Sequence, residues 1–133
     1  MIGDIDEVLN RQVPPGLYDT AAGQPMWTAF RSQSADKGLM STLRGRVAPQ
    51  EAHRRHTEDH GRSSVGTWGV KVGDANEHGL ACVDDGAAAE NPHDHASVDF
   101  NGLTKAEARI AGMALHETAC QHGPLYVPGQ GVS

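Results

Sequence analysis

Residues 91–100 read Asn-Pro-His-Asp-His-Ala-Ser-Val-Asp-Phe, a stretch in which polar and apolar residues alternate. Successive side chains of a β-strand point to opposite faces, so a strand here places Ala96, Val98 and Phe100 on one face. The opposite face then carries His93, His95, Ser97 and Asp99. One apolar and one polar face are typical of an antiparallel sheet that covers a core on one side. This stretch therefore favours a fold built on such a sheet.

The rest of the chain supplies further strands and helices. We predict strands at residues 27–32, 39–44, 65–72, 80–83 and 93–100. We predict helices at residues 1–13, 49–60 and 104–121. The last helix has the clearest start, because Thr104 and Glu107 have the spacing of a capping box. The order of elements predicts an α+β fold, with a small, mostly antiparallel sheet and two or three helices packed on it.

The length of 133 residues suits one domain, which we expect to span residues 27–127. The run Pro14-Pro15-Gly16 interrupts the chain, so residues 1–26 are expected to form an amino-terminal arm and residues 128–133 a tail. The core face of the sheet should pack under the last helix through Ile110 and Met113. That face is expected to comprise Trp68, Val70, Val72, Ala96, Val98 and Phe100.

The charge and the cysteines limit the partners and the location. A formal charge of −6 disfavours nucleic acid, because phosphate binding needs a clustered basic surface. No apolar run reaches the roughly 18 residues that a membrane-spanning helix needs. Cys82 and Cys120 lie far apart, which favours free thiols in a reducing compartment over a disulfide. We expect a cytoplasmic monomer or homodimer whose partner is another protein or a small polar ligand, and no membrane.

Eight histidines are distributed unevenly along the chain. His53, His56 and His60 have the spacing of one helix face, and His93 and His95 share one strand face. A helix and a strand together could therefore offer a divalent metal such as zinc the imidazoles of His56, His60, His93 and His95. No spacing matches an established zinc signature, so packing or surface roles remain the alternative.

The same strand face suggests acid–base chemistry, in which His95 would transfer a proton with Asp99 as its partner. A Ser97–His95–Asp99 triad is disfavoured, because neighbours at i and i+2 stand about 6.6–7 Å apart along a strand. Arginines beside the Ser41 strand, Arg44 among them, could bind a carboxylate or phosphate. The alternative is an edge strand protected by charge. The candidate catalytic residues are His95, Asp99, Ser41 and Arg44.

Three motifs give the chain a resemblance to a group of small uncharacterised bacterial proteins. They are Leu-Met-Ser-Thr-Leu-Arg-Gly at residues 39–45, Ser-Val-Gly-Thr-Trp-Gly-Val-Lys-Val-Gly at 64–73 and His-Ala-Ser-Val-Asp-Phe at 95–100. The resemblance covers residues 27–127 and implies a compact α+β domain, with no function to carry over. The matching positions that draw attention are Ser41, Arg44, Trp68, His95 and Asp99.

Two functional hypotheses follow from these observations. The first is a small binding or interaction protein without catalysis, an accessory or immunity-type partner of another protein, because no complete catalytic signature is present. The second is a small enzyme that uses a His/Asp site, with or without a bound metal, on the 93–99 strand face for acid–base chemistry. The two differ in whether the purified protein turns over a substrate.

Overall fold

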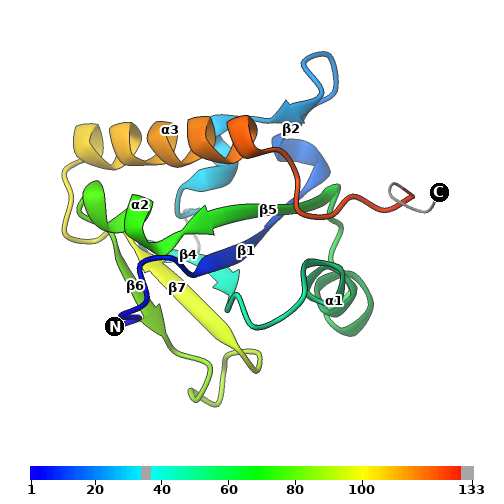
Figure 1. The fold of residues 1–133 in the computed structure, drawn as a ribbon, viewed down its shortest axis with the longest axis horizontal. Coiled ribbons are helices and arrows are strands. Elements are labelled where there is room, and N and C mark those ends of the chain that lie inside the picture. Colours follow the sequence, from blue (N-terminus) through cyan, green and yellow to red (C-terminus); the bar gives the residue numbers. More distant parts are fainter. Residues whose placement is uncertain (34–36, 130–133) are drawn as a thin grey trace.

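The computed structural model describes residues 1–33 and 37–129, and a five-stranded sheet forms its centre (Figure 1). The strands are β1 (Val8–Val13), β4 (Leu39–Leu43), β5 (Gly66–Lys71), β6 (Ala81–Asp84) and β7 (His95–Asp99). Their order is β5-β1-β4-β7-β6, and every neighbouring pair is antiparallel. Two short strands, β2 (Tyr18–Asp19) and β3 (Gln24–Pro25), form a separate hairpin. The structure confirms the predicted α+β fold with a mostly antiparallel sheet.

Helices cover both faces of the sheet. Helix α3 (Lys105–His122) lies along one face, together with the 3₁₀ turn η2 (Trp27–Phe30) (Figure 1). Helix α1 (Pro49–Arg54) continues as a π-helical turn, η4 (Arg55–Asp59), and packs on the opposite face. There the Thr67 hydroxyl donates a hydrogen bond to the Pro49 carbonyl oxygen over 3.2 Å. The shorter elements are the turn η1 (Pro15–Leu17) and helix α2 (Val72–Glu77).

The predicted core face is buried, whereas the predicted helix face was wrong. All six expected core residues of the sheet are at most 4% exposed: Trp68, Val70, Val72, Ala96, Val98 and Phe100. Thr104 and Glu107 form the predicted capping box of α3. Ile110 and Met113, however, are 63% and 45% exposed. The buried side of α3 carries the small residues Ala111, Gly112 and Ala119 around Leu115.

Close packing explains why small residues face the core. A Cβ atom added at Gly112 would lie 3.0 Å from the carbonyl oxygen of Phe30, so a larger residue there would require the helix or η2 to shift. Trp27 also contacts this site, and it takes the place in the packing that larger helix side chains would otherwise fill. A count of large apolar residues along the helix therefore gives the wrong face.

The amino-terminal prediction was also wrong. Residues 8–13 form β1, which pairs with β5 over six residues and with β4 on its other side, instead of a helix in an arm. Leu9 and Val13 are completely buried, so this segment is part of the core. The ladder of hydrogen bonds on two edges outweighs the local helix signal of the Asp4–Glu7 spacing.

Smaller differences concern the ends and types of elements. Residues 27–30 form the 3₁₀ turn η2 rather than a strand, with Ala29 and Phe30 buried. Helix α2 begins at Val72, where the strand was expected to continue. Both cysteines are free thiols, as predicted. Of the predicted tail, residues 130–133 lie outside the described part of the chain. Across residues 1–33 and 37–129, the helices are too short or too polar to cross a bilayer.

Candidate functional site

A cleft of about 1160 Å³ opens on the face of the sheet that carries α1. Residues of β1 and β4 line its floor, among them Arg11 and Ser41. Helix α1 and the turn η4 form one wall, and the loop that leads into β7 forms another. Four of the histidines singled out from the sequence line this cleft: His56, His60, His93 and His95. The cleft is therefore the place where candidate chemical groups meet.

Sheet register brings Ser41 and His95 together on the cleft floor. Ser41 lies opposite Ser97 in the β4–β7 ladder, and His95 lies two residues before Ser97 on the same face. Diagonal neighbours on adjacent antiparallel strands are within reach of each other's side chains. The Nε2 atom of His95 lies 3.2 Å from the Oγ atom of Ser41. The imidazole is buried at 7% exposure, whereas Ser41 is exposed to the cleft.

Asp85 completes this group from the loop after β6. Its Oδ1 atom lies 2.5 Å from Nδ1 of His95, and its Oδ2 atom accepts a hydrogen bond from the Ser97 hydroxyl over 2.5 Å. Glycine at position 86 allows this loop to fold against β7, since a Cβ atom there would lie 2.9 Å from the main-chain nitrogen of His95. Two buried hydroxyl and imidazole donors thus hold both carboxylate oxygens of Asp85 in place.

The hydrogen bonds assign the protonation pattern of the neutral imidazole. Since the Asp85 carboxylate only accepts, the proton resides on Nδ1 of His95 and the lone pair of Nε2 points at the Ser41 hydroxyl. A hydroxyl, an imidazole that can take its proton and a carboxylate that orients the imidazole are the three parts of a nucleophilic triad. Both atom pairs, Asp85 Oδ1 with His95 Nδ1 and His95 Nε2 with Ser41 Oγ, are within hydrogen-bonding distance.

A positive charge lies beside the serine. Strands β1 and β4 share only the register pair Asn10–Leu43, so the Arg11 side chain reaches between the diverging strands. Its Nε and NH1 atoms donate to the carbonyl oxygens of Ala29 and Ser41 over 2.8 and 2.9 Å. The guanidinium is therefore fixed next to the main chain of Ser41, where it contributes a positive field to the cleft floor.

The loop that carries His95 into the cleft is held by ion pairs. Asp94 adopts a left-handed backbone conformation with a φ of 66°, and it is 8% exposed. Its carboxylate accepts from Arg46 over 2.7 Å and from Arg55 of the η4 turn over 3.1 Å. These hydrogen bonds, that of Arg46 above all, lower the pKa of Asp94. They tie the wall made by α1 and η4 to the start of β7 and so stabilise the strained turn.

His56 of the η4 turn is a neutral imidazole in the wall of the cleft. Desolvation by burial, and then the charges of Arg62 and Arg11, lower its pKa from 6.5 to about 4. Its ring makes no hydrogen bond to the rest of residues 1–33 and 37–129. At neutral pH this imidazole can accept or donate one hydrogen bond to a molecule in the cleft.

The lowered pKa of His56 predicts a pH dependence of stability. Between pH 6.5 and about 4 the unfolded chain binds a proton at His56 and the folded chain does not, so stability falls as the pH falls through this range. From about pH 7.5 to about pH 5 the free energy of unfolding should drop by about 1 kcal/mol through this group, since solvent screening at the partly exposed ring reduces the effect of the full pKa shift. Urea unfolding at a series of pH values measures the drop.

Other titratable groups could also change stability with pH, so the experiment needs control variants. His53 and His60 of the same helical segment add to the effects of Arg11 and Arg62 on its pKa. The pKa values of carboxylates such as Glu7 and Asp94 are lowered from 4.5 and 3.8, so these groups affect stability mainly below the measured interval of about pH 7.5 to about pH 5. His56→Gln should remove most of the drop, and the exposed His78→Gln should leave it unchanged. An equal drop in His56→Gln would contradict the assignment.

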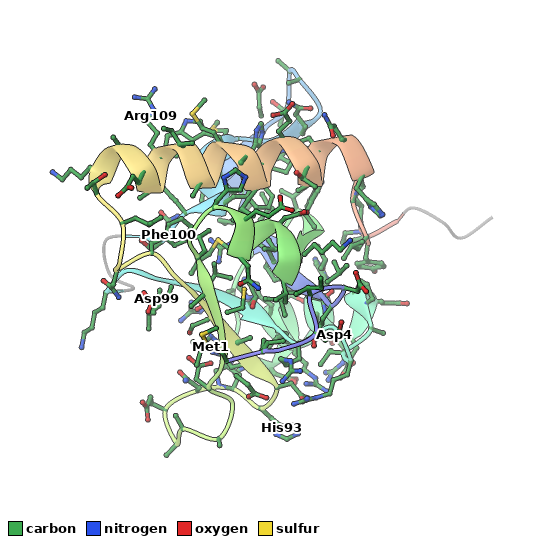
Figure 2. The ribbon with its side chains drawn as sticks, turned by 60° about the vertical axis from the view of Figure 1, so that its left-hand side comes forward. Met1, Asp4, His93, Asp99, Phe100 and Arg109 are labelled. Carbon is green, nitrogen blue, oxygen red and sulfur yellow. The ribbon has the colours of Figure 1, made fainter. Side chains whose placement is uncertain are left out.

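Two of the predicted catalytic residues meet in the site and two do not. Ser41 and His95 are brought together. Asp99 lies at the other end of β7 from His93 and His95, where it accepts a hydrogen bond from the Asn101 nitrogen over 2.8 Å (Figure 2). Arg44 forms ion pairs with Glu7 and Asp84 and does not line the cleft. The predicted edge strand was wrong as well, because β4 lies between β1 and β7.

The four histidines proposed as metal ligands do not form a metal-binding group. In the described part of the chain, no three His, Cys, Asp or Glu side chains are arranged to hold a metal ion. Both ring nitrogens of His95 already have partners in Asp85 and Ser41. His93 precedes the strand instead of belonging to it, and its side chain points outward with 87% exposure (Figure 2). The four histidines therefore line one cleft without converging on one metal-binding position.

Sequence reasoning missed Asp85 and Arg11. Asp85 sits in a stretch from residue 84 to 90 that reads as a flexible linker, and only the fold of the loop against β7 shows its partner. Arg11 lies in the segment taken for an arm. One local signal was present for Asp85, since the acidic pair Asp84–Asp85 is followed by glycine, a sequence typical of a tight turn.

Comparison of the chain with known protein families, with curated proteins and with solved structures finds no match. The resemblance noted from short motifs therefore stays a prediction. The class that the fold and the site define is a small α+β protein with an Asp–His–Ser group at the floor of a cleft.

Proposed function

We propose that this protein is a small enzyme that transfers an acyl group, most simply to water, with Ser41 as the nucleophile. The observation that carries the proposal is the chain of contacts from Asp85 through His95 to Ser41, with the serine exposed to a large cleft. The hypothesis of acid–base chemistry at His95 is kept, and Asp85 takes the role first given to Asp99.

The geometry supports a two-step reaction. As Oγ of Ser41 attacks the carbonyl carbon of an ester or amide, Nε2 of His95 takes the hydroxyl proton, and Asp85 stabilises the resulting imidazolium. The tetrahedral intermediate collapses, and the leaving alcohol or amine receives the proton from Nε2. Water then attacks the acyl–serine ester with His95 again as the base, which releases the acid and restores Ser41.

The surroundings of the triad suit this chemistry. The Arg11 guanidinium donates to the Ser41 carbonyl oxygen over 2.9 Å, and its positive charge near the cleft floor favours a reaction in which negative charge develops there. Ser97, at 3% exposure, holds the second oxygen of Asp85 and so prevents rotation of the carboxylate. A preoriented base and a nearby cation are the features that lower the barrier of an acyl transfer.

A panel of chromogenic aryl esters, neutral and anionic, tests the proposal. Wild-type protein should hydrolyse at least one of them, and His95→Gln should lower kcat by about 10²–10⁴-fold, the usual contribution of a general base. His93→Gln provides the matched control, because His93 lines the same cleft but points outward. Equal rates in the two variants would remove His95 from the reaction.

The first hypothesis from the sequence, binding without catalysis, is the second candidate. The size of the cleft favours it, since about 1160 Å³ accommodates a small polar ligand. It predicts saturable binding of such a ligand with no turnover, and an affinity that Ser41→Ala leaves unchanged. Turnover that depends on His95 would exclude it.

A further inference from the structure

The charges around the cleft are unlike those of the whole chain. The protein has a formal charge of −6, yet the cleft is lined by three arginines, Arg11, Arg55 and Arg62, and by two carboxylates, Asp59 and Glu90. A local excess of positive charge in a concave site concentrates anions there, whereas the net negative charge of the rest of the protein repels them.

Ion pairs inside the wall leave part of this charge uncompensated. Arg55 pairs with Glu51 over 2.9 Å and with Asp94 over 3.1 Å, and Asp59 pairs with Arg54 over 3.1 Å. Arg62 follows the η4 turn, is exposed and forms no ion pair with the described residues. The guanidinium of Arg62 is therefore available to a ligand in the cleft.

His56 shows that the positive field reaches the wall of the cleft. Arg62 and Arg11 are the two strongest charges acting on this imidazole, and both disfavour its protonation. The ring is half-buried and makes no hydrogen bond within the described residues. A half-buried imidazole that lacks a hydrogen-bond partner and lies in the field of two guanidinium groups is stabilised by an anion that accepts its N–H.

We propose that the cleft binds the carboxylate or phosphate of a small anionic substrate among Arg62, His56 and Arg11, next to Ser41. The proposal rests on the acyl-transfer function and gives its substrate class: an ester or amide that also carries an anionic group. Arg62 supplies a planar pair of donors, for which carboxylate and phosphate oxygens are the best acceptors. Arg11 connects the two parts of the site, because it donates to the Ser41 carbonyl oxygen over 2.9 Å.

The test measures anion binding separately from turnover. Inorganic phosphate and acetate are titrated into the Ser41→Ala protein, and the ring signals of the histidines are followed by NMR. We expect saturable shifts of the His56 signals and a rise in the pKa of His56, because a bound anion favours the imidazolium. The anion that binds more tightly distinguishes a phosphate from a carboxylate substrate.

Substitutions at two arginines, Arg62 and the control Arg31, decide the outcome. Arg62→Gln should weaken binding of the anion about tenfold or more, as expected for loss of a charge-assisted hydrogen bond, and Arg62→Lys should restore part of it. Arg31→Gln should not change the affinity, because Arg31 lies over the Trp27 ring and away from the cleft. Equal weakening in both Gln variants, or no saturable shift of His56, would overturn the subsite. Binding without ester turnover would keep the subsite and refute the acyl-transfer function.

Discussion

Replacement of Ser41 by alanine is expected to lower kcat for the best ester substrate by about 10⁴-fold or more, the loss that follows removal of a nucleophile from a triad. The hydroxyl lies 3.2 Å from Nε2 of His95, and no other hydroxyl is in contact with that nitrogen within the described residues. Steady-state kinetics with the wild-type and variant proteins at equal concentration measure the loss. KM should change little, because the hydroxyl is small and the cleft walls remain.

Ser63 offers a matched control for this substitution. It is also an exposed serine that lines the cleft, and its hydroxyl makes no contact with His95. Ser63→Ala should therefore keep kcat within about twofold of wild type, as for a surface substitution that touches no catalytic group. Similar losses in both variants would mean that the cleft tolerates no change, and full activity in Ser41→Ala would refute the nucleophile.

The Trp68→Ala substitution should lower the free energy of unfolding by about 3–5 kcal/mol, because the side chain is almost completely buried. Trp68 is 3% exposed and belongs to β5, which pairs with β1, and its ring centroid lies 6.0 Å from that of Tyr18. A loss of this size is a large part of the stability of a small domain, so we expect the variant to be partly unfolded at 37 °C. Urea denaturation monitored by far-ultraviolet circular dichroism gives the value.

The Ile110→Ala substitution tests whether the loss of stability depends on burial of the side chain and not on its size alone. This large apolar residue is 63% exposed on α3, so its truncation should change the free energy of unfolding by less than about 0.5 kcal/mol. A destabilisation of Ile110→Ala as large as that of Trp68→Ala would mean that α3 packs through the face predicted from sequence. Comparison of the two variants therefore tests which face of α3 packs against the core.

Alternation of side chains was sufficient to place β7 and β5, because each strand has one apolar face that only a core can cover. It was not sufficient for β1. The sequence of residues 8–13, Val-Leu-Asn-Arg-Gln-Val, has three polar residues in a row, and two of them, Asn10 and Arg11, are buried in a strand that pairs with both β5 and β4. Burial of Asn10 depends on the carbonyl oxygens of Arg44 and Val47, which are distant in sequence. No local pattern contains that information.

The candidate site shows the same limit. His95 and Ser41 were both singled out, but their contact depends on the β4–β7 register, which pairs Ser41 with Ser97, a residue 56 positions further along the chain. Asp99 was chosen as the acid because it shares a strand face with His95, whereas the partner, Asp85, comes from a loop that folds back across β7. Strand periodicity predicts which residues share a face. It does not predict which loop approaches that face.

Covalent labelling tests the proposed nucleophile most directly. A fluorophosphonate reacts with an activated serine when Oγ displaces fluoride from phosphorus, and the adduct is located by mass spectrometry of the intact protein and its peptides. The proposed function predicts one phosphonyl group, on Ser41, that forms in the wild type and fails to form in His95→Gln. Labelling that is absent from the wild type, or that occurs on Ser63 as readily as on Ser41, would contradict it.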